Sequence, residues 1–90
     1  MSDIETKISN FNNWGQPWTF HTFVCSDQSI SLKSIELFNE IWIKASDFEL
    51  WHNDDLILGC RASHKFILDN YSLTDETIAK IVRAISYEWA

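Results

Sequence analysis

Five tryptophans in a chain of ninety residues constrain most strongly what this sequence can fold into. Six phenylalanines and two tyrosines accompany them. Each aromatic side chain buries on the order of 150–250 Å² when it packs in a core, and a buried indole N–H needs a hydrogen-bond partner. The rings must therefore either fill the core of a small domain or be presented to a partner. The five are spread over the whole chain: Trp14, Trp18, Trp42, Trp51 and Trp89.

The length and composition are typical of one folded domain, which we place over residues 1–90. A chain this short buries only about 60–65% of the surface that it exposes when unfolded, so its core is thin. Apolar residues make up 46% of the chain and charged residues 22%, which favours a folded domain over disorder. Two glycines and one proline leave little room for flexible linkers.

The hydropathy pattern predicts a cytoplasmic protein. No uninterrupted apolar run exceeds three residues, which is too short for a transmembrane helix. The first residues are acidic, without the basic and then apolar segments of a signal peptide. In the cytoplasm Cys25 and Cys60 are expected to stay reduced.

The charge balance is acidic, with thirteen Asp and Glu against seven Lys and Arg and a net charge of −6. Binding to nucleic-acid phosphates needs a basic patch, so we expect no nucleic-acid partner. A basic protein partner would suit this charge. No catalytic motif is visible, and no glycine-rich loop could hold a phosphate. The sequence therefore predicts a protein that is not an enzyme.

Two segments at the ends of the chain predict helices. Near the N-terminus, apolar side chains recur at helical spacing at Ile4, Ile8 and Phe11. Near the C-terminus, Thr74 is a suitable N-cap, and the two acidic residues after it suit the positive end of a helix dipole. The stripe that follows comprises Ile78, Ile81, Val82, Ile85 and Trp89.

A third helix is predicted over about residues 31–45. Ser31 can cap it, and Ile30 and Ile35 can form a hydrophobic staple across its first turn. A strand over the same residues is the alternative, because Ile35, Leu37, Ile41 and Ile43 would share one strand face. The length of the segment favours the helix.

Four segments are interpreted as strands. Residues 18–25 are aromatic and β-branched, with apolar groups on both faces of an extended chain. Residues 48–52, 56–62 and 65–71 are short apolar runs separated by a polar turn at 53–55 and a bend at 63–64. Such spacing is typical of an antiparallel meander.

These elements predict an α+β fold in the order α-β-α-β-β-β-α. The simplest arrangement is a four-stranded, mainly antiparallel sheet with the helices packed on one face. The other face would then be an exposed apolar surface. Such a surface normally binds a partner or a second copy of the chain.

Two histidines and two cysteines make up the ligand set of a tetrahedral zinc site. They are His21, Cys25, Cys60 and His64. On the expected strand His21 and Cys25 would lie about 13 Å apart, too far for one metal ion, so a turn or helix would have to bring them together. We therefore expect no cofactor. The alternatives are a zinc- or small-molecule-binding domain built on these four residues, or a reactive thiol with a histidine base, for which His52 is another candidate.

The tryptophans are expected to divide between core and surface. Trp42 and Trp89 lie on helical apolar stripes, which predicts that they pack in the core. Trp14 and Trp18 flank a turn, and Trp51 precedes one, so we expect these three rings to be partly accessible. Tryptophan is enriched among the residues that dominate binding energy at interfaces.

We accordingly expect a small acidic protein-interaction domain without catalysis. In composition it is like the inhibitors, immunity proteins and antitoxins that bind and block another protein, and a homodimer is a compatible variant. The expected binding residues are Trp14, Trp18 and Trp51, with Trp51 as the anchor. Glu49, Asp54 and Asp55 would pair with basic groups of the partner.

Overall fold

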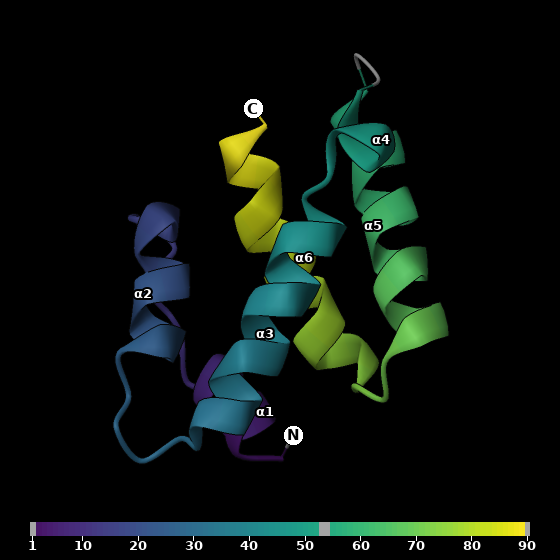
Figure 1. Cartoon of the computed structure of the whole chain (residues 1–90). Coiled ribbons are helices and arrows are strands. Elements are labelled where there is room, and N and C mark those ends of the chain that lie inside the picture. Colours follow the sequence, from purple (N-terminus) through teal and green to yellow (C-terminus); the bar gives the residue numbers. More distant parts are fainter. Residues whose placement is uncertain (1, 53–54, 90) are drawn as a thin grey trace.

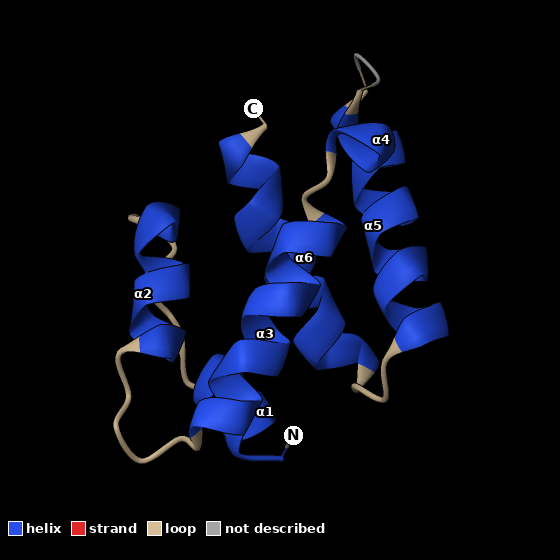
Figure 2. Cartoon of the chain, in the orientation of Figure 1, coloured by secondary structure: helices blue, strands red, loops and turns tan. Residues whose placement is uncertain are grey.

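The computed structural model describes residues 2–52 and 55–89, and every regular element within these ranges is a helix (Figure 2). In Figure 1, α1 lies at the bottom and α6 lies between the α1–α2 and the α4–α5 parts of the molecule. The elements are α1 (Ser2–Ser9), the 3₁₀ helix η1 (Pro17–Thr19), α2 (Phe20–Cys25), α3 (Leu32–Ala45), α4 (Phe48–Trp51), α5 (Leu56–Asn70) and α6 (Asp75–Glu88).

The α+β prediction is therefore wrong. No strand occurs among the described residues, so there is neither a four-stranded sheet nor an uncovered sheet face. The segment expected as the first strand forms η1 and α2, and the expected meander forms α4 and α5.

The three predicted helices are confirmed, two of them with their caps. The Ser31 side chain accepts a hydrogen bond from the backbone N–H of Ser34, and Thr74 accepts one from Thr77. Side-chain caps of this kind satisfy amide groups that have no partner within the helix. Ile4 and Ile8 on α1 are fully buried.

The first expected strand is helical because its apolar residues also fit a helical period. Phe20 and Val24 lie one turn apart and are both fully buried, and Phe23 lies beside them on the inner face of α2. Pro17 starts η1, where its fixed φ suits a first turn and its missing N–H costs no hydrogen bond. The two-residue alternation of this segment concealed the helical stripe.

The expected meander is mostly one helix, α5, whose inner face carries small residues. Gly59, Ser63 and Ile67 recur every four residues and are all buried. Two of the three contribute nothing to a hydrophobic pattern, so the helical period was invisible in the sequence. Asp55, expected in a turn between strands, is the N-cap of α5 and accepts a hydrogen bond from the Ile57 N–H.

The side chain of Trp51 covers the small face of α5. A Cβ atom added at Gly59 would lie 2.9 Å from Cζ3 of Trp51 and closer still to Cε3, so the ring occupies the space left by the glycine. The Trp51 indole N–H donates to the Ala45 carbonyl oxygen at 2.7 Å, and the Ser63 hydroxyl donates to the same oxygen at 2.8 Å. One carbonyl at the end of α3 thus joins α4 and α5.

The core is assembled around α6. Its inner stripe packs on α5, α3, α1 and η1. Ile78, Ile81 and Ile85 on this stripe are fully buried, as are Phe38 and Ile41 on α3. A helix that is buried along one whole side and contacts most other elements fixes their positions relative to one another.

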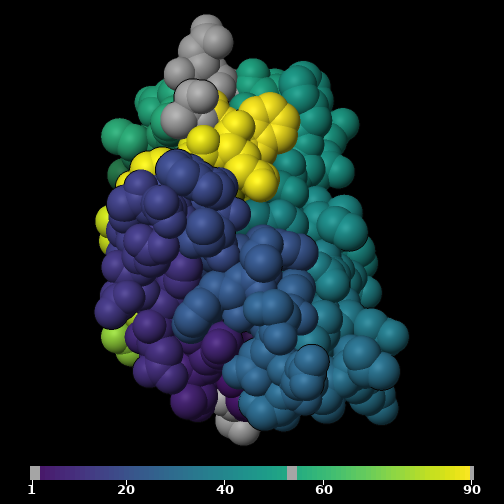
Figure 3. Space-filling view, turned by 90° about the vertical axis from the view of Figure 1, so that its left-hand side faces the viewer, coloured from purple at the N-terminus to yellow at the C-terminus, as the bar shows by residue number. Residues whose placement is uncertain are grey.

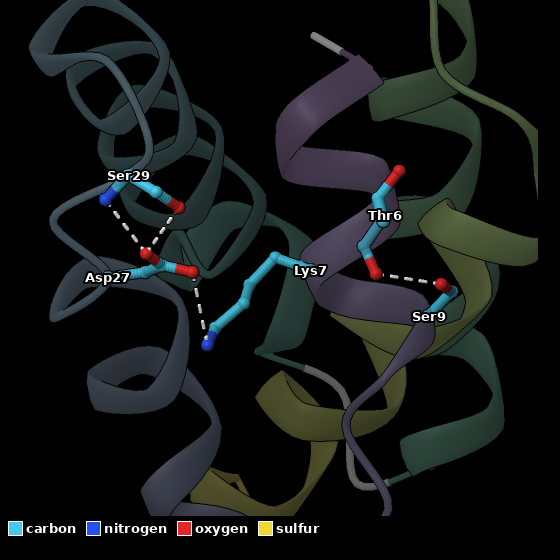
Figure 4. A network of polar contacts seen from close by, with 5 residues as sticks. All are labelled: Thr6, Lys7, Ser9, Asp27 and Ser29. Carbon is cyan, nitrogen blue, oxygen red and sulfur yellow. Dashed lines mark hydrogen bonds and ion pairs between the residues drawn. The ribbon is translucent and has the colours of Figure 1, made fainter.

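Polar contacts hold α1 in place. Lys7 forms an ion pair with Asp27 at 3.3 Å, and the backbone N–H and hydroxyl of Ser29 donate to the other carboxylate oxygen (Figure 4). These hydrogen bonds and Lys7 lower the pKa of Asp27. On the other side of α1, the Glu5 carboxylate accepts a hydrogen bond from the Thr74 N–H. The helix α1 is therefore linked both to the segment between α2 and α3 and to the start of α6.

Candidate interaction groove

An open groove of about 600 Å³ lies between α5 and α6. From α5 it is lined by residues that recur on one side of the helix, since Cys60, His64 and Leu68 are four residues apart. From α6 the lining follows the same rule. Ala79, Val82, Arg83 and Ser86 are spaced at three, one and three residues, which places them along one edge of that helix. The two helices α5 and α6, side by side, thus form an elongated trough.

The floor of the groove is apolar. Val82 and Ala79 contribute short aliphatic side chains from α6, and Cys60 lies opposite on α5. Leu68 is 50% exposed at one end of the trough. Ile57, which does not line the trough, lies near the start of α5 toward the other end and is 63% exposed.

The rim of the groove is basic, although the chain is acidic. Arg61 and Lys65 lie on the α5 side and Arg83 on the α6 side, which is three of the seven basic residues of the chain. Asp69 is the one Asp or Glu among the lining residues that the structure describes, and it pairs with Lys65 at 3.1 Å. His64 lies 3.6 Å from Asp75. Within the described residues Arg61 has no ion-pair partner.

Arg83 is held at the rim by an aromatic ring. Its guanidinium lies 4.1 Å from the ring centroid of Trp14, a cation–π contact. Trp14 is itself fixed by an edge contact with Phe11 and by stacking on Phe20. Trp14 is half-buried, in agreement with the expected partial accessibility, and its ring holds Arg83. Its role in binding a partner stays a prediction.

The four candidate zinc ligands form two separate pairs. The members of each pair lie one helical turn apart, His21 and Cys25 on α2 and Cys60 and His64 on α5. In the described part of the chain, no three His, Cys, Asp or Glu side chains lie close enough together to hold one metal ion. The segment that holds His21 and Cys25 is helical, as a shared metal ion would require. However, α2 and α5 each bring together only two of the four candidate ligands.

The pair on α2 does not form an activated thiol. The Cys25 sulfur lies 3.6 Å from His21 Nε2, and the same nitrogen lies 2.6 Å from Asn39 Oδ1. A ring nitrogen that donates its proton to Asn39 has no lone pair with which to deprotonate Cys25. Burial also raises the pKa of Cys25, which keeps the thiol protonated and weakly nucleophilic. The three side chains act as a polar link between α2 and α3.

Burial likewise raises the pKa of Cys60 in the groove. Its neighbour His64 contacts Asp75 rather than the sulfur in the contacts of the described residues. His52, the remaining histidine, lies at the surface with Nδ1 2.9 Å from the Glu49 carbonyl oxygen. Neither histidine therefore completes the nucleophile and base pair considered from the sequence.

The residues of the expected binding face differ in exposure. Trp51 is only 4% exposed, so the expectation that its ring is partly accessible is wrong. Glu49 is exposed on α4, Asp55 caps α5, and Asp54 lies outside the described residues. Trp18 is accessible as expected, at 71% exposure.

The expectation that Trp42 and Trp89 pack in the core is correct only in part. Trp42 is half-buried and packs its ring near Phe20 and Phe38. Trp89 follows the end of α6 and is 37% exposed, stacked on Trp51 at a centroid distance of 6.4 Å. The stripe of α6 thus leaves the core one turn before Trp89.

Comparisons with protein-family models, with curated proteins and with solved structures find no match for this chain. None of the described helices combines the length and the apolar character needed to cross a membrane. The geometry of the groove is therefore the basis on which a function can be proposed.

Proposed function

We propose that this chain is a small protein-interaction domain that binds an amphipathic helix of a partner in the groove between α5 and α6. The observation that carries the proposal is an apolar trough with a basic rim on a chain of net charge −6. Helices bind such troughs by laying an apolar face on the floor. The partner helix would carry acidic residues beside that face.

The dimensions of the groove suit a short helix. Its lining runs along α5 from Cys60 to Asp69, which corresponds to roughly 13 Å at the rise of an α-helix. Two to three turns of a partner helix would cover this length. The groove is open along its side, so a helix could enter without any rearrangement of α5 or α6.

The charge of the partner follows from the rim. Acidic side chains would meet Arg61, which lacks an ion-pair partner among the described residues, and Arg83, which Trp14 holds in place. Complementary charges of this kind contribute mainly to specificity and association rate. The acidic net charge and the acidic residues beside Trp51 predict a basic partner from the sequence. Trp51 is buried, and the basic rim of the groove favours an acidic partner helix.

Selection from a library of amphipathic helical peptides of about four turns, with the charges beside the apolar face randomised, tests the proposal. We expect the selected peptides to be acidic. Arg61→Glu should weaken their binding by roughly fivefold, because reversing one rim charge costs on the order of 1 kcal/mol. Leu68→Ser should weaken it by a similar factor through lost apolar contact.

Matched variants on α3 provide the controls. Lys33→Glu reverses an exposed charge and Leu32→Ser removes an exposed leucine, both away from the groove lining. Each should change affinity less than twofold, and all four variants should unfold at the temperature of the parent within a few degrees. The proposal is contradicted if the selected peptides are neutral or basic, or if the α3 variants weaken binding as much as the groove variants do.

A further inference from the structure

A second, smaller hollow lies where η1, α3 and α6 meet. It measures about 160 Å³ and is lined by Pro17 and Trp18 from η1, Trp42 from α3, and Ala84, Tyr87 and Glu88 from α6. In Figure 3 the last turn of α6, in yellow, lies next to the surface of the η1–α2 segment and of α3. Three segments that are far apart in the sequence thus contribute to one small site.

Three aromatic rings line this hollow without stacking on one another. Trp42 contacts the rings of Phe20, His21 and Phe38, which lie on its inner side. In the described part of the chain Trp18 and Tyr87 make no ring contact, and they are 71% and 45% exposed. Their faces therefore remain accessible to a ligand.

The charge of the hollow is negative. Glu88 is the only Asp or Glu among its described lining residues, and no Lys, Arg or His is among them. Elsewhere the chain covers aromatic rings with its own cations, since Lys7 lies 3.9 Å above Phe23 and Arg83 lies 4.1 Å above Trp14. The hollow at Trp18 has the rings and a carboxylate but no such cation from the described chain.

We infer that this hollow binds a methylated ammonium group. The electron-rich faces of tryptophan and tyrosine attract cations, and clusters of such rings recognise quaternary ammonium ligands. A cavity of about 150 Å³ holds a benzene molecule, and a trimethylammonium group is of similar size. Methylation also weakens hydration, so such a group loses less than a bare ammonium ion when the rings displace water.

Packing fixes part of the site. Pro17 is buried and fixes the backbone beside Trp18, and the short side chain of Ala84, also buried, leaves the space of the hollow open. Trp42 is held by three neighbouring rings. The site shares no lining residue with the groove between α5 and α6, so it is independent of the proposed function.

A titration with choline tests the inference, and NMR of the tryptophan indole N–H signals monitors the binding. The matched probe is dimethylbutanol, in which a carbon atom replaces the nitrogen, so shape is kept and charge is lost. We expect choline to shift the Trp18 and Trp42 signals with a dissociation constant in the low millimolar range. Dimethylbutanol should bind at least about tenfold more weakly.

Variants of the lining residues locate the effect. Trp18→Ala should weaken choline binding about tenfold, and Glu88→Gln, at an exposed and therefore screened carboxylate, about threefold. Phe48→Ala, which removes another exposed aromatic ring, and Glu36→Gln, which neutralises another carboxylate away from the hollow, should leave binding unchanged. Equal binding of choline and dimethylbutanol would overturn the inference, as would an unchanged affinity in both Trp18→Ala and Glu88→Gln.

A second arm distinguishes the source of the cation. A short neutral peptide containing trimethyl-lysine is titrated beside the same peptide with unmodified lysine. Tighter binding of the trimethyl-lysine peptide than of choline assigns the site to a modified protein, and the reverse order assigns it to a choline compound. Binding of the unmodified lysine peptide as tightly as the methylated one contradicts a site for methylated ammonium groups.

Discussion

The contact between Gly59 and Trp51 determines how α4 packs on α5. Alanine normally stabilises a helix interior by about 1 kcal/mol relative to glycine. At position 59 the added Cβ would overlap the Trp51 ring, so we expect Gly59→Ala to destabilise the fold by about 1–3 kcal/mol in urea unfolding. Gly15→Ala is the control, because a Cβ added there has no atom within 4 Å apart from its chain neighbours and the φ of Gly15 is not positive. A stabilised Gly59→Ala variant would contradict the packing described.

The carbonyl oxygen of Ala45 accepts hydrogen bonds from both Trp51 and Ser63. Either Trp51→Phe or Ser63→Ala leaves this buried oxygen with one donor, whereas the double variant leaves it with none. Because an unsatisfied buried acceptor costs about 1–3 kcal/mol, the double variant should lose at least about 1 kcal/mol more than the sum of the two single variants. Additive losses in a denaturant double-mutant cycle would show that the two donors are independent.

At the scale of elements, one hydrogen bond links the end of α5 to α3. The Tyr71 hydroxyl donates to the Glu40 carboxylate at 2.8 Å, and burial together with this contact raises the pKa of Tyr71 to about 12. Because this value lies above the ordinary value near 10, the link stabilises the fold below about pH 10 and is lost as the pH rises through about 12. In an NMR titration of the Tyr71 ring, Glu40→Gln should lower its pKa toward 10. Glu36→Gln, on the same helix, should leave it unchanged.

The helices also differ in how well the sequence predicts them. Ser31 and Thr74 precede regular apolar stripes, so α3 and α6 could be predicted from capping and periodicity. The inner face of α5 includes Gly59 and Ser63, and the small size of Gly59 makes room for the Trp51 ring. The hydrophobic pattern of α5 therefore does not predict this face, because the apolar group that buries it is a ring from another helix.

The groove could be predicted only in part for the same reason. Arg61 and Lys65 are four residues apart, a spacing that would have placed them on one side of α5 if that segment had been recognised as a helix. Arg83 joins them from α6, and no local pattern links it to the other two. The sequence shows seven scattered basic residues, and the packing of two helices collects three of them at one rim.

At the scale of the whole molecule, α6 separates two sites of opposite charge. On one side it forms the basic groove with α5, and on the other it forms the aromatic hollow with η1 and α3. The groove depends on the continuity of α5, and the hollow depends on the packing of η1 and α3 near α6. If α5 were two strands joined by a bend, its lining residues would alternate between two faces and the groove would not exist.

The continuity of α5 is therefore the central claim, and backbone chemical shifts over residues 56–70 test it most directly. We predict Cα shifts displaced in the helical direction at every residue from Leu56 to Asn70, including Ser63 and His64 in the middle of the segment. Shifts displaced in the opposite direction over residues 56–62 and 65–70, with a break at 63–64, would contradict the helix, the groove and the packing of Trp51 together.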